Sequence, residues 1–137
     1  MPSTLLILRL VHLAFVLAWF QFLFLLHFLH PPEHPVPVAY PIVLAAVAIS
    51  SISVCERLRK QLVHEPAVTL ETQPENQAVW NRWRAGNILS FAFAESTMLF
   101  GVLLKFLGES WKVVGMFFAV GLVLLLVWTP RAVKVWR

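Results

Sequence analysis

Residues 5–29 read LLILRLVHLAFVLAWFQFLFLLHFL, and this stretch decides the fold class. About 20 consecutive apolar residues in a helix are enough to cross the hydrocarbon core of a bilayer. The stretch exceeds that length, and it is also longer than the apolar region of a cleaved signal peptide. We therefore expect a retained transmembrane helix over these residues.

The composition of the chain points to the same class. Of its 137 residues, 59% are apolar and only 13% are charged. A soluble domain of this length has too little interior to hide so much apolar surface, so membrane lipids have to cover it. The net charge of +4 lies on no polar domain large enough to bind nucleic acid, and we expect no nucleic-acid partner.

Three further apolar stretches follow the first. Each has to be helical, because lipid offers no hydrogen-bond partner to backbone N–H and C=O groups. The sequence thus predicts an all-α, polytopic membrane protein, with four transmembrane helices in one domain over residues 1–137. The spans are expected at about residues 5–29, 38–57, 85–107 and 111–128.

The distribution of basic residues predicts the orientation. The proline-rich connection before residue 40 has no Lys or Arg, whereas the second connection and the C-terminal tail are basic. Short basic segments stay on the cytoplasmic side of a membrane. Both termini and the second connection are therefore predicted to be cytoplasmic. The basic residues concerned are Arg57, Arg59, Lys60, Arg82 and Arg84 in the connection, and Arg131, Lys134 and Arg137 in the tail.

We expect the second and third spans to extend beyond the bilayer as a long antiparallel hairpin, with its tip at about residues 58–84. Pro74 is suited to the first turn of the returning helix, because proline fits a position whose N–H has no helical partner. Trp80 and Trp83 are typical of a membrane–water interface. These residues predict where the returning helix starts and where it enters the membrane.

Glu95 is the residue that most suggests a function. It lies about ten residues into the third span, roughly 15 Å deep and near the bilayer centre. A charged carboxylate there costs about 2.5–3.5 kcal/mol on insertion scales, so a proton, a cation or a hydrogen-bonding partner has to neutralise it. Two interpretations stay open: Glu95 carries a proton or an ion, or it is a buried hydrogen-bonding group that packs helices together.

The residues around Glu95, from Phe91 to Gly101, read FAFAESTMLFG. This run resembles the second helix of the c subunit, the proteolipid of rotary ATP synthases, in its sodium-binding form. The resemblance covers the middle hairpin only and includes Gln73 and Pro74 in the preceding connection. It implies that the Glu95 carboxylate binds the ion, either a proton or sodium, and that several copies assemble into a homo-oligomer.

The same resemblance implies roles for the two residues that follow Glu95. Ser96 would contribute its hydroxyl oxygen to the ion, and Thr97 would hold a coordinating water. Depth along the helices suggests a further partner: Ser50 and Ser51 lie within about one helical turn of the level of Glu95. We predict that one of these two serines completes the site.

Histidines support two other hypotheses. His27, His30, Glu33 and His34 cluster near the outer end of the first span and could hold a metal, although amphipathic side chains at a membrane interface explain them as well. A haem with two histidine ligands needs them on different helices. His12 and His27 lie on the same helix, which argues against a haem within one chain.

Three smaller features complete the sequence. Lys105 is expected to extend its ammonium group to the lipid headgroups. Small residues at Gly86, Ser90 and Ala94 recur every four positions and predict a helix–helix contact. Cys55 is the single cysteine, so the chain can form no internal disulfide.

The function that the sequence predicts is that of a c-subunit-like membrane protein, which binds a proton or a sodium ion on Glu95. The alternative is a structural or accessory subunit of a larger membrane complex. The sequence shows no nucleophile motif and no phosphate-binding loop. We therefore expect no enzymatic activity and no cofactor apart from a possible sodium ion.

Overall fold

The computed structural model describes residues 2–133, which contain helices and no strand. Ala39 to Thr72 form one continuous helix, in which two α-helical parts flank a π-helical turn. The basic residues Lys134 and Arg137 lie outside the described residues. The elements are α1 (Pro2–Leu29), α2 (Ala39–Arg59), the π-helical turn η1 (Lys60–His64), α3 (Glu65–Thr72), α4 (Gln77–Phe106) and α5 (Trp111–Val127).

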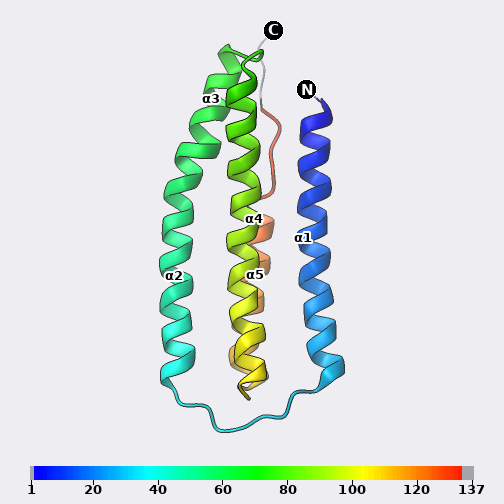
Figure 1. The fold of residues 1–137 in the computed structure, drawn as a ribbon, viewed down its shortest axis with the longest axis vertical. Helices are drawn as coiled ribbons and strands as arrows, with labels where there is room; N and C mark the ends of the chain where they lie inside the picture. Colours follow the sequence, from blue (N-terminus) through cyan, green and yellow to red (C-terminus); the bar gives the residue numbers. More distant parts are fainter. Residues whose placement is uncertain (1, 134–137) are drawn as a thin grey trace.

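The central helix of the bundle is α4. It packs against α5, against α1 and against the continuous helix formed by α2, η1 and α3 (Figure 1). The start of α1, the connection 73–76 and the segment 128–133 lie at one end, called here the termini end. The connections 30–38 and 107–110 lie at the other end, called here the loop end.

Three helices are long and apolar enough to cross a membrane: Ser3–Leu29, Ala39–Thr72 and Gln77–Phe106. The fourth, α5, is apolar but shorter, with 17 residues. Large apolar side chains such as Phe24 and Ile49 are exposed on the outside of the bundle. Contiguous apolar surface of this kind needs a lipid or protein neighbour, so the structure is compatible with a membrane protein.

Pro66 explains the π-helical turn. Proline has no N–H, so the carbonyl of Leu62, four residues earlier, loses its α-helical donor. Just before it, the Glu65 N–H bonds to the carbonyl of Lys60, five residues earlier, in the pattern of a π-helix. The helix therefore changes its hydrogen bonding over Lys60–His64, just before Pro66, without ending, and it continues to Thr72.

The returning helix begins later than the sequence predicts. Pro74 lies in the turn between α3 and α4, and the first residue of α4 is Gln77. Asn76 caps the helix, because its side chain accepts a hydrogen bond from the Val79 N–H. The Pro74 carbonyl accepts a bond from the indole N–H of Trp80 at 2.9 Å. The prediction for Pro74 was wrong because a capping side chain, not the proline, determines where α4 starts.

Trp80 and Trp83 are core residues. Both are almost fully buried in a cluster at the termini end that also includes Leu8, Val63 and Leu70. They hold α1, η1 and α3 to α4 and do not face outward as interface anchors, which corrects the prediction for these two residues. A larger apolar cluster fills the middle of the bundle.

The small residues of α4 form the predicted helix contact. A Cβ atom added at Gly86 would lie 2.7 Å from the Cβ atom of Leu62 and 2.8 Å from its carbonyl oxygen. Ser90, one turn later, hydrogen-bonds to a side chain of α2. The Ala94 carbonyl lies 3.1 Å from a Cβ atom added at Gly121 of α5. The stripe is therefore a place where two neighbouring helices approach α4 closely.

Candidate ion-binding site

Glu95 lies near the middle of α4. The residue is half-buried, and both of its carboxyl oxygens are shielded from solvent. Neither oxygen has a hydrogen-bond partner among residues 2–133. A carboxylate in apolar surroundings is costly unless it is paired, so the group is stable here only with a proton or a cation.

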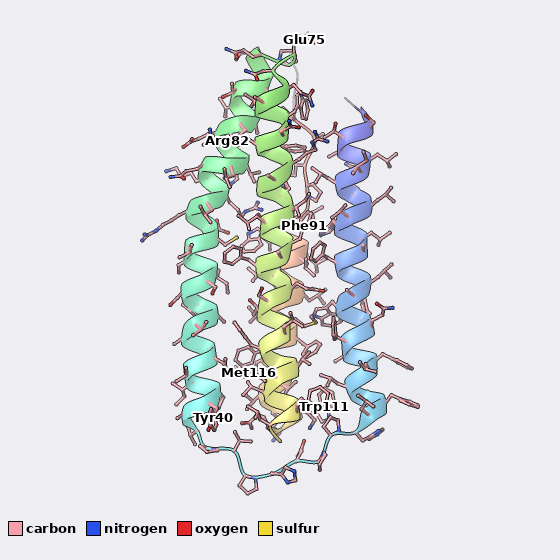
Figure 2. All side chains as sticks on the ribbon, viewed as in Figure 1. Tyr40, Glu75, Arg82, Phe91, Trp111 and Met116 are labelled. Atoms are coloured by element: carbon pink, nitrogen blue, oxygen red, sulfur yellow. The ribbon has the colours of Figure 1, made fainter. Side chains whose placement is uncertain are left out.

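Phe91, one turn before Glu95, shows which helix this side of α4 faces. Its ring centroid lies 5.0 Å from that of His12 and 5.8 Å from that of Phe15, both on α1. Figure 2 shows Phe91 on the side of α4 that faces α1. Successive helical residues turn by about 100°, which puts Glu95 about 40° from Phe91 around the helix axis. Glu95 therefore lies at the seam between α1 and α4.

Ser50 and Ser51 belong to α2, which packs on a different side of α4 from the side that carries Glu95. They line a surface groove on α2 together with Phe93. Ser90, which also faces α2, is about 140° from Glu95 around the α4 axis. Neither serine hydrogen-bonds to Glu95 in the described residues, so the structure does not bring them together with it. Depth along a helix can be estimated from sequence, but the rotation of each helix in the bundle cannot.

Ser96 and Thr97 direct their hydroxyl groups to the backbone of their own helix. Ser96 Oγ donates to the Ala92 carbonyl at 2.8 Å, and Thr97 Oγ1 donates to the Phe93 carbonyl at 3.3 Å. A hydroxyl oxygen that donates its proton can still offer lone pairs to a cation. Thr97, however, is buried about 160° around the α4 axis from Glu95. Ser96 is thus the closer of the two implied ligands.

Two polar side chains attach α1 to α5 beside this seam. His12 Nε2 lies 2.7 Å from the Leu125 carbonyl oxygen, and it carries the proton in this bond because a carbonyl oxygen only accepts. Trp19 Nε1 donates to the Phe118 carbonyl at 2.8 Å. These long-range bonds set the register of α1. Only the presence of a polar ring atom within an apolar helix could have indicated them from sequence.

Lys105 is the buried cation of α4. The prediction that its ammonium group extends to the lipid headgroups was therefore wrong. The side chain is 1% exposed, and its Nζ lies 3.0 Å from a carboxylate oxygen of Glu33. The same ammonium donates to the Glu109 carbonyl at 3.2 Å and lies 4.8 Å from the ring centroid of Trp111. It is held inside the loop end and does not extend to lipid headgroups.

The histidines of the loop end are not gathered around a common point. Within residues 2–133, no group of three or more His, Cys, Asp or Glu side chains is close enough to hold a metal ion. His27 and His30 have ring centroids 5.3 Å apart, and Glu33 pairs with Lys105. This cluster therefore offers two neighbouring rings and not a ligand set.

The chain matches no protein-family model, and no curated protein or solved structure is significantly similar to it. Function therefore has to follow from the residues and their geometry. The two observations that bear on it most are the unpartnered Glu95 carboxyl group and the α1–α4 seam in which it lies.

Proposed function

We propose that this chain is an integral membrane protein that reversibly binds a proton on Glu95, at the seam between α1 and α4. The observation that supports this proposal is the burial of both carboxyl oxygens without a protein partner. An ionisable residue within a membrane-spanning helix is by default a functional residue, because its insertion is costly. A proton is the simplest group that removes the cost.

Sodium is the alternative ion. A small hard cation needs several oxygen ligands at close range. Thr97 lies on another side of α4, and Ser50 and Ser51 line a groove that faces α2. Ser96 is then the hydroxyl best placed to help Glu95, which is a small ligand set for sodium. The arrangement therefore favours a proton over a sodium ion.

We propose four membrane crossings with both chain ends in the cytoplasm. The termini end, which carries Arg82, Arg84 and Arg131, would be the cytoplasmic end. With 17 residues, α5 is about 25 Å long, close to the roughly 30 Å of a hydrocarbon core. The longer helices Ala39–Thr72 and Gln77–Phe106 then extend past α5 as the predicted hairpin.

Cysteine labelling tests this topology. The single native cysteine, Cys55, is buried, so an introduced cysteine will dominate the signal. A membrane-impermeant thiol reagent added to intact cells should label a cysteine at His34 and should label one at Gln73 only after the membrane is opened. If the reagent labels the cysteine at Gln73 but not the cysteine at His34 in intact cells, the proposed orientation is wrong.

A carbodiimide tests proton binding on Glu95. Dicyclohexylcarbodiimide attacks protonated carboxyl groups in apolar surroundings, so it should modify Glu95 selectively, and modification should weaken as pH rises. Glu95→Gln should abolish the modification, and Glu75→Gln should not, because Glu75 is exposed in the turn before α4 (Figure 2). If sodium at constant pH protects Glu95 from the reagent, the ion that Glu95 binds is sodium and not a proton.

The alternative function, a structural or accessory subunit, predicts a different outcome. If Glu95 resists the reagent at every pH and Glu95→Gln destabilises the protein, the carboxyl group serves packing. The mass of the protein in mild detergent separates the assemblies: a closed ring of identical chains fits the c-subunit-like proposal, and a complex with other chains fits an accessory subunit.

A further inference from the structure

A second site lies at the termini end, far from the loop end and distinct from the Glu95 seam. A cavity of about 580 Å³ opens between η1, α3, α4 and the segment 128–133. This volume is in the range of small-molecule sites, about 300–1,000 Å³. Its wall combines aromatic and apolar side chains with charged ones. The lining includes the aromatic and apolar side chains of Trp83, Trp128 and Val127, with the charged side chains of Arg59, Glu71 and Arg131.

Arg59 is the lining residue that points to a ligand. As a whole residue it is 8% exposed, and it lines the cavity. Nη1 donates to Ser90 Oγ at 2.9 Å, and the guanidinium carbon lies 5.0 Å from the ring centroid of Trp128. Its Nε has no hydrogen-bond partner among residues 2–133, and no carboxylate in that range forms an ion pair with it. A buried cation with five N–H donors is thus only partly satisfied.

The carboxylates of the wall leave this cation available. Glu56 Oε1 accepts the indole N–H of Trp128 at 2.8 Å, and Glu56 acts on Arg59 as a nearby negative charge without forming a direct ion pair with it. Glu71 lies on α3, half-buried, and makes no ion pair with Arg59. Arg131 is exposed and adds a second positive charge to the wall. The part of the cavity around Arg59 is therefore suited to an anion.

The backbone beside Arg59 is also unusual. The π-helical turn η1 begins at the next residue, Lys60, and contributes Val63 and His64 to the wall. Such turns inside longer helices occur frequently at functional sites. Here the turn lies between the buried guanidinium and α3, so it shapes one side of the cavity.

We infer that this cavity binds the phosphate group of a phospholipid headgroup. Arginine is the side chain that best matches phosphate, because its planar group donates two parallel hydrogen bonds. Val127, the last residue of α5, lines the cavity, so its mouth lies where an apolar span ends and headgroups begin. The inference rests on the chain crossing a membrane, but it does not depend on proton binding by Glu95.

Native mass spectrometry of the delipidated full chain in detergent tests the inference. The probe is phosphatidylethanolamine, and diacylglycerol with the same acyl chains is the control that lacks phosphate. The phospholipid should bind at least about tenfold more tightly than diacylglycerol, because charged hydrogen bonds contribute that much. Equal binding of the two lipids would overturn the inference, because the phosphate would then contribute nothing.

A matched pair of variants tests Arg59 itself. Arg59→Met should weaken phospholipid binding by about tenfold or more, and Arg57→Met should leave it within about twofold. Arg57 is exposed on the same helix, lies outside the cavity wall and carries the same charge. Equal affinities for the two variants would overturn the assignment.

A second pair keeps the test valid if Arg59→Met does not fold, since Arg59 also joins α2 to α4. Arg131→Gln removes an exposed charge of the wall and should weaken phospholipid binding. Arg82→Gln removes an exposed charge outside the wall and should not weaken it. Inorganic phosphate that binds as tightly as the phospholipid would identify a soluble phosphate site and overturn the lipid assignment. Glu95→Gln should bind phospholipid normally, which separates this outcome from the test of proton binding.

Discussion

Lys105 and Glu95 are both ionisable residues shielded by the bundle on α4, about three turns apart, and their surroundings differ. Lys105 has a carboxylate, a carbonyl oxygen and an aromatic ring as neighbours at the loop end. Glu95 has no hydrogen-bond partner for either carboxyl oxygen in the described chain. The comparison teaches that the charge of Lys105 is part of the fold, whereas the carboxyl group of Glu95 is left for a ligand.

The largest effect is expected for Glu33→Gln. This change removes the only carboxylate that pairs with Lys105 in the described residues, and it leaves a 1% exposed ammonium without a counter-charge. The melting temperature of the protein in detergent should fall by several degrees. Glu75→Gln, the same chemical change in an exposed turn, should leave the melting temperature unchanged.

The double variant Glu33→Gln with Lys105→Met sharpens this result. Only Lys105 of this pair is buried, since Glu33 is 54% exposed. Replacement of both charged groups avoids leaving a buried charge unpaired, whereas removal of one partner does not. The double variant should therefore regain most of the stability that Glu33→Gln loses. A double variant less stable than Glu33→Gln alone would show that Lys105 acts through its other contacts.

Acid should have the next largest effect, on the same pair. The hydrogen bond from Lys105, and then its positive charge, hold the pKa of Glu33 below its ordinary value of 4.5. A group with a lowered pKa in the folded state stabilises the protein fully above the unfolded value and loses that contribution as pH falls through the folded one. The melting temperature should therefore decline below pH 4.5, and the decline should be smaller in Lys105→Met.

A moderate gain of stability is expected for Glu95→Leu. A buried polar group without a partner carries a desolvation cost of about 1–3 kcal/mol, and leucine removes it. The free energy of unfolding in detergent should rise by up to this amount, while modification by the carbodiimide is lost. Glu95→Gln should lose the modification without the gain. Destabilisation by leucine would show that Glu95 has a structural partner, and the contrast with Lys105 would fail.

The smallest effect is expected for Ser50→Ala and Ser51→Ala. Both serines lie on the α2 groove, away from Glu95, so the rate of carbodiimide modification should not change. The stability change should stay within about 0.5 kcal/mol, as for other surface positions. A change in Glu95 reactivity would place the serines in the site after all.

The helices were predictable where apolar stretches end abruptly. The first apolar stretch was expected at 5–29 and forms a helix from Pro2 to Leu29, and the last was expected at 111–128 and forms Trp111–Val127. The second span was expected at 38–57, with its helix extending beyond the bilayer, and the helix runs from Ala39 to Thr72. A change from apolar to polar residues marks where the surface of a helix meets water. It does not mark where the backbone hydrogen bonds of the helix stop.

The site was predictable only in part. The shielding of Glu95 follows from a carboxyl group within an apolar stretch. Its seam with α1 depends on how each helix is rotated, which no spacing in the sequence reports. The pairing of Lys105 with Glu33 joins residues 72 positions apart and depends on the connection 30–38 folding under α4. Partners of that kind become visible only when the helices are assembled.

The helix order also has a consequence for how the protein is made. α1 is synthesised before α4 and α5, yet it packs against both. Until α5 emerges from the ribosome, the Trp19 indole N–H lacks the Phe118 carbonyl that it meets in the folded protein. α1 therefore lacks these packing partners until α4 and α5 have been made. Assembly of this bundle can consequently be completed only after α5 has been made.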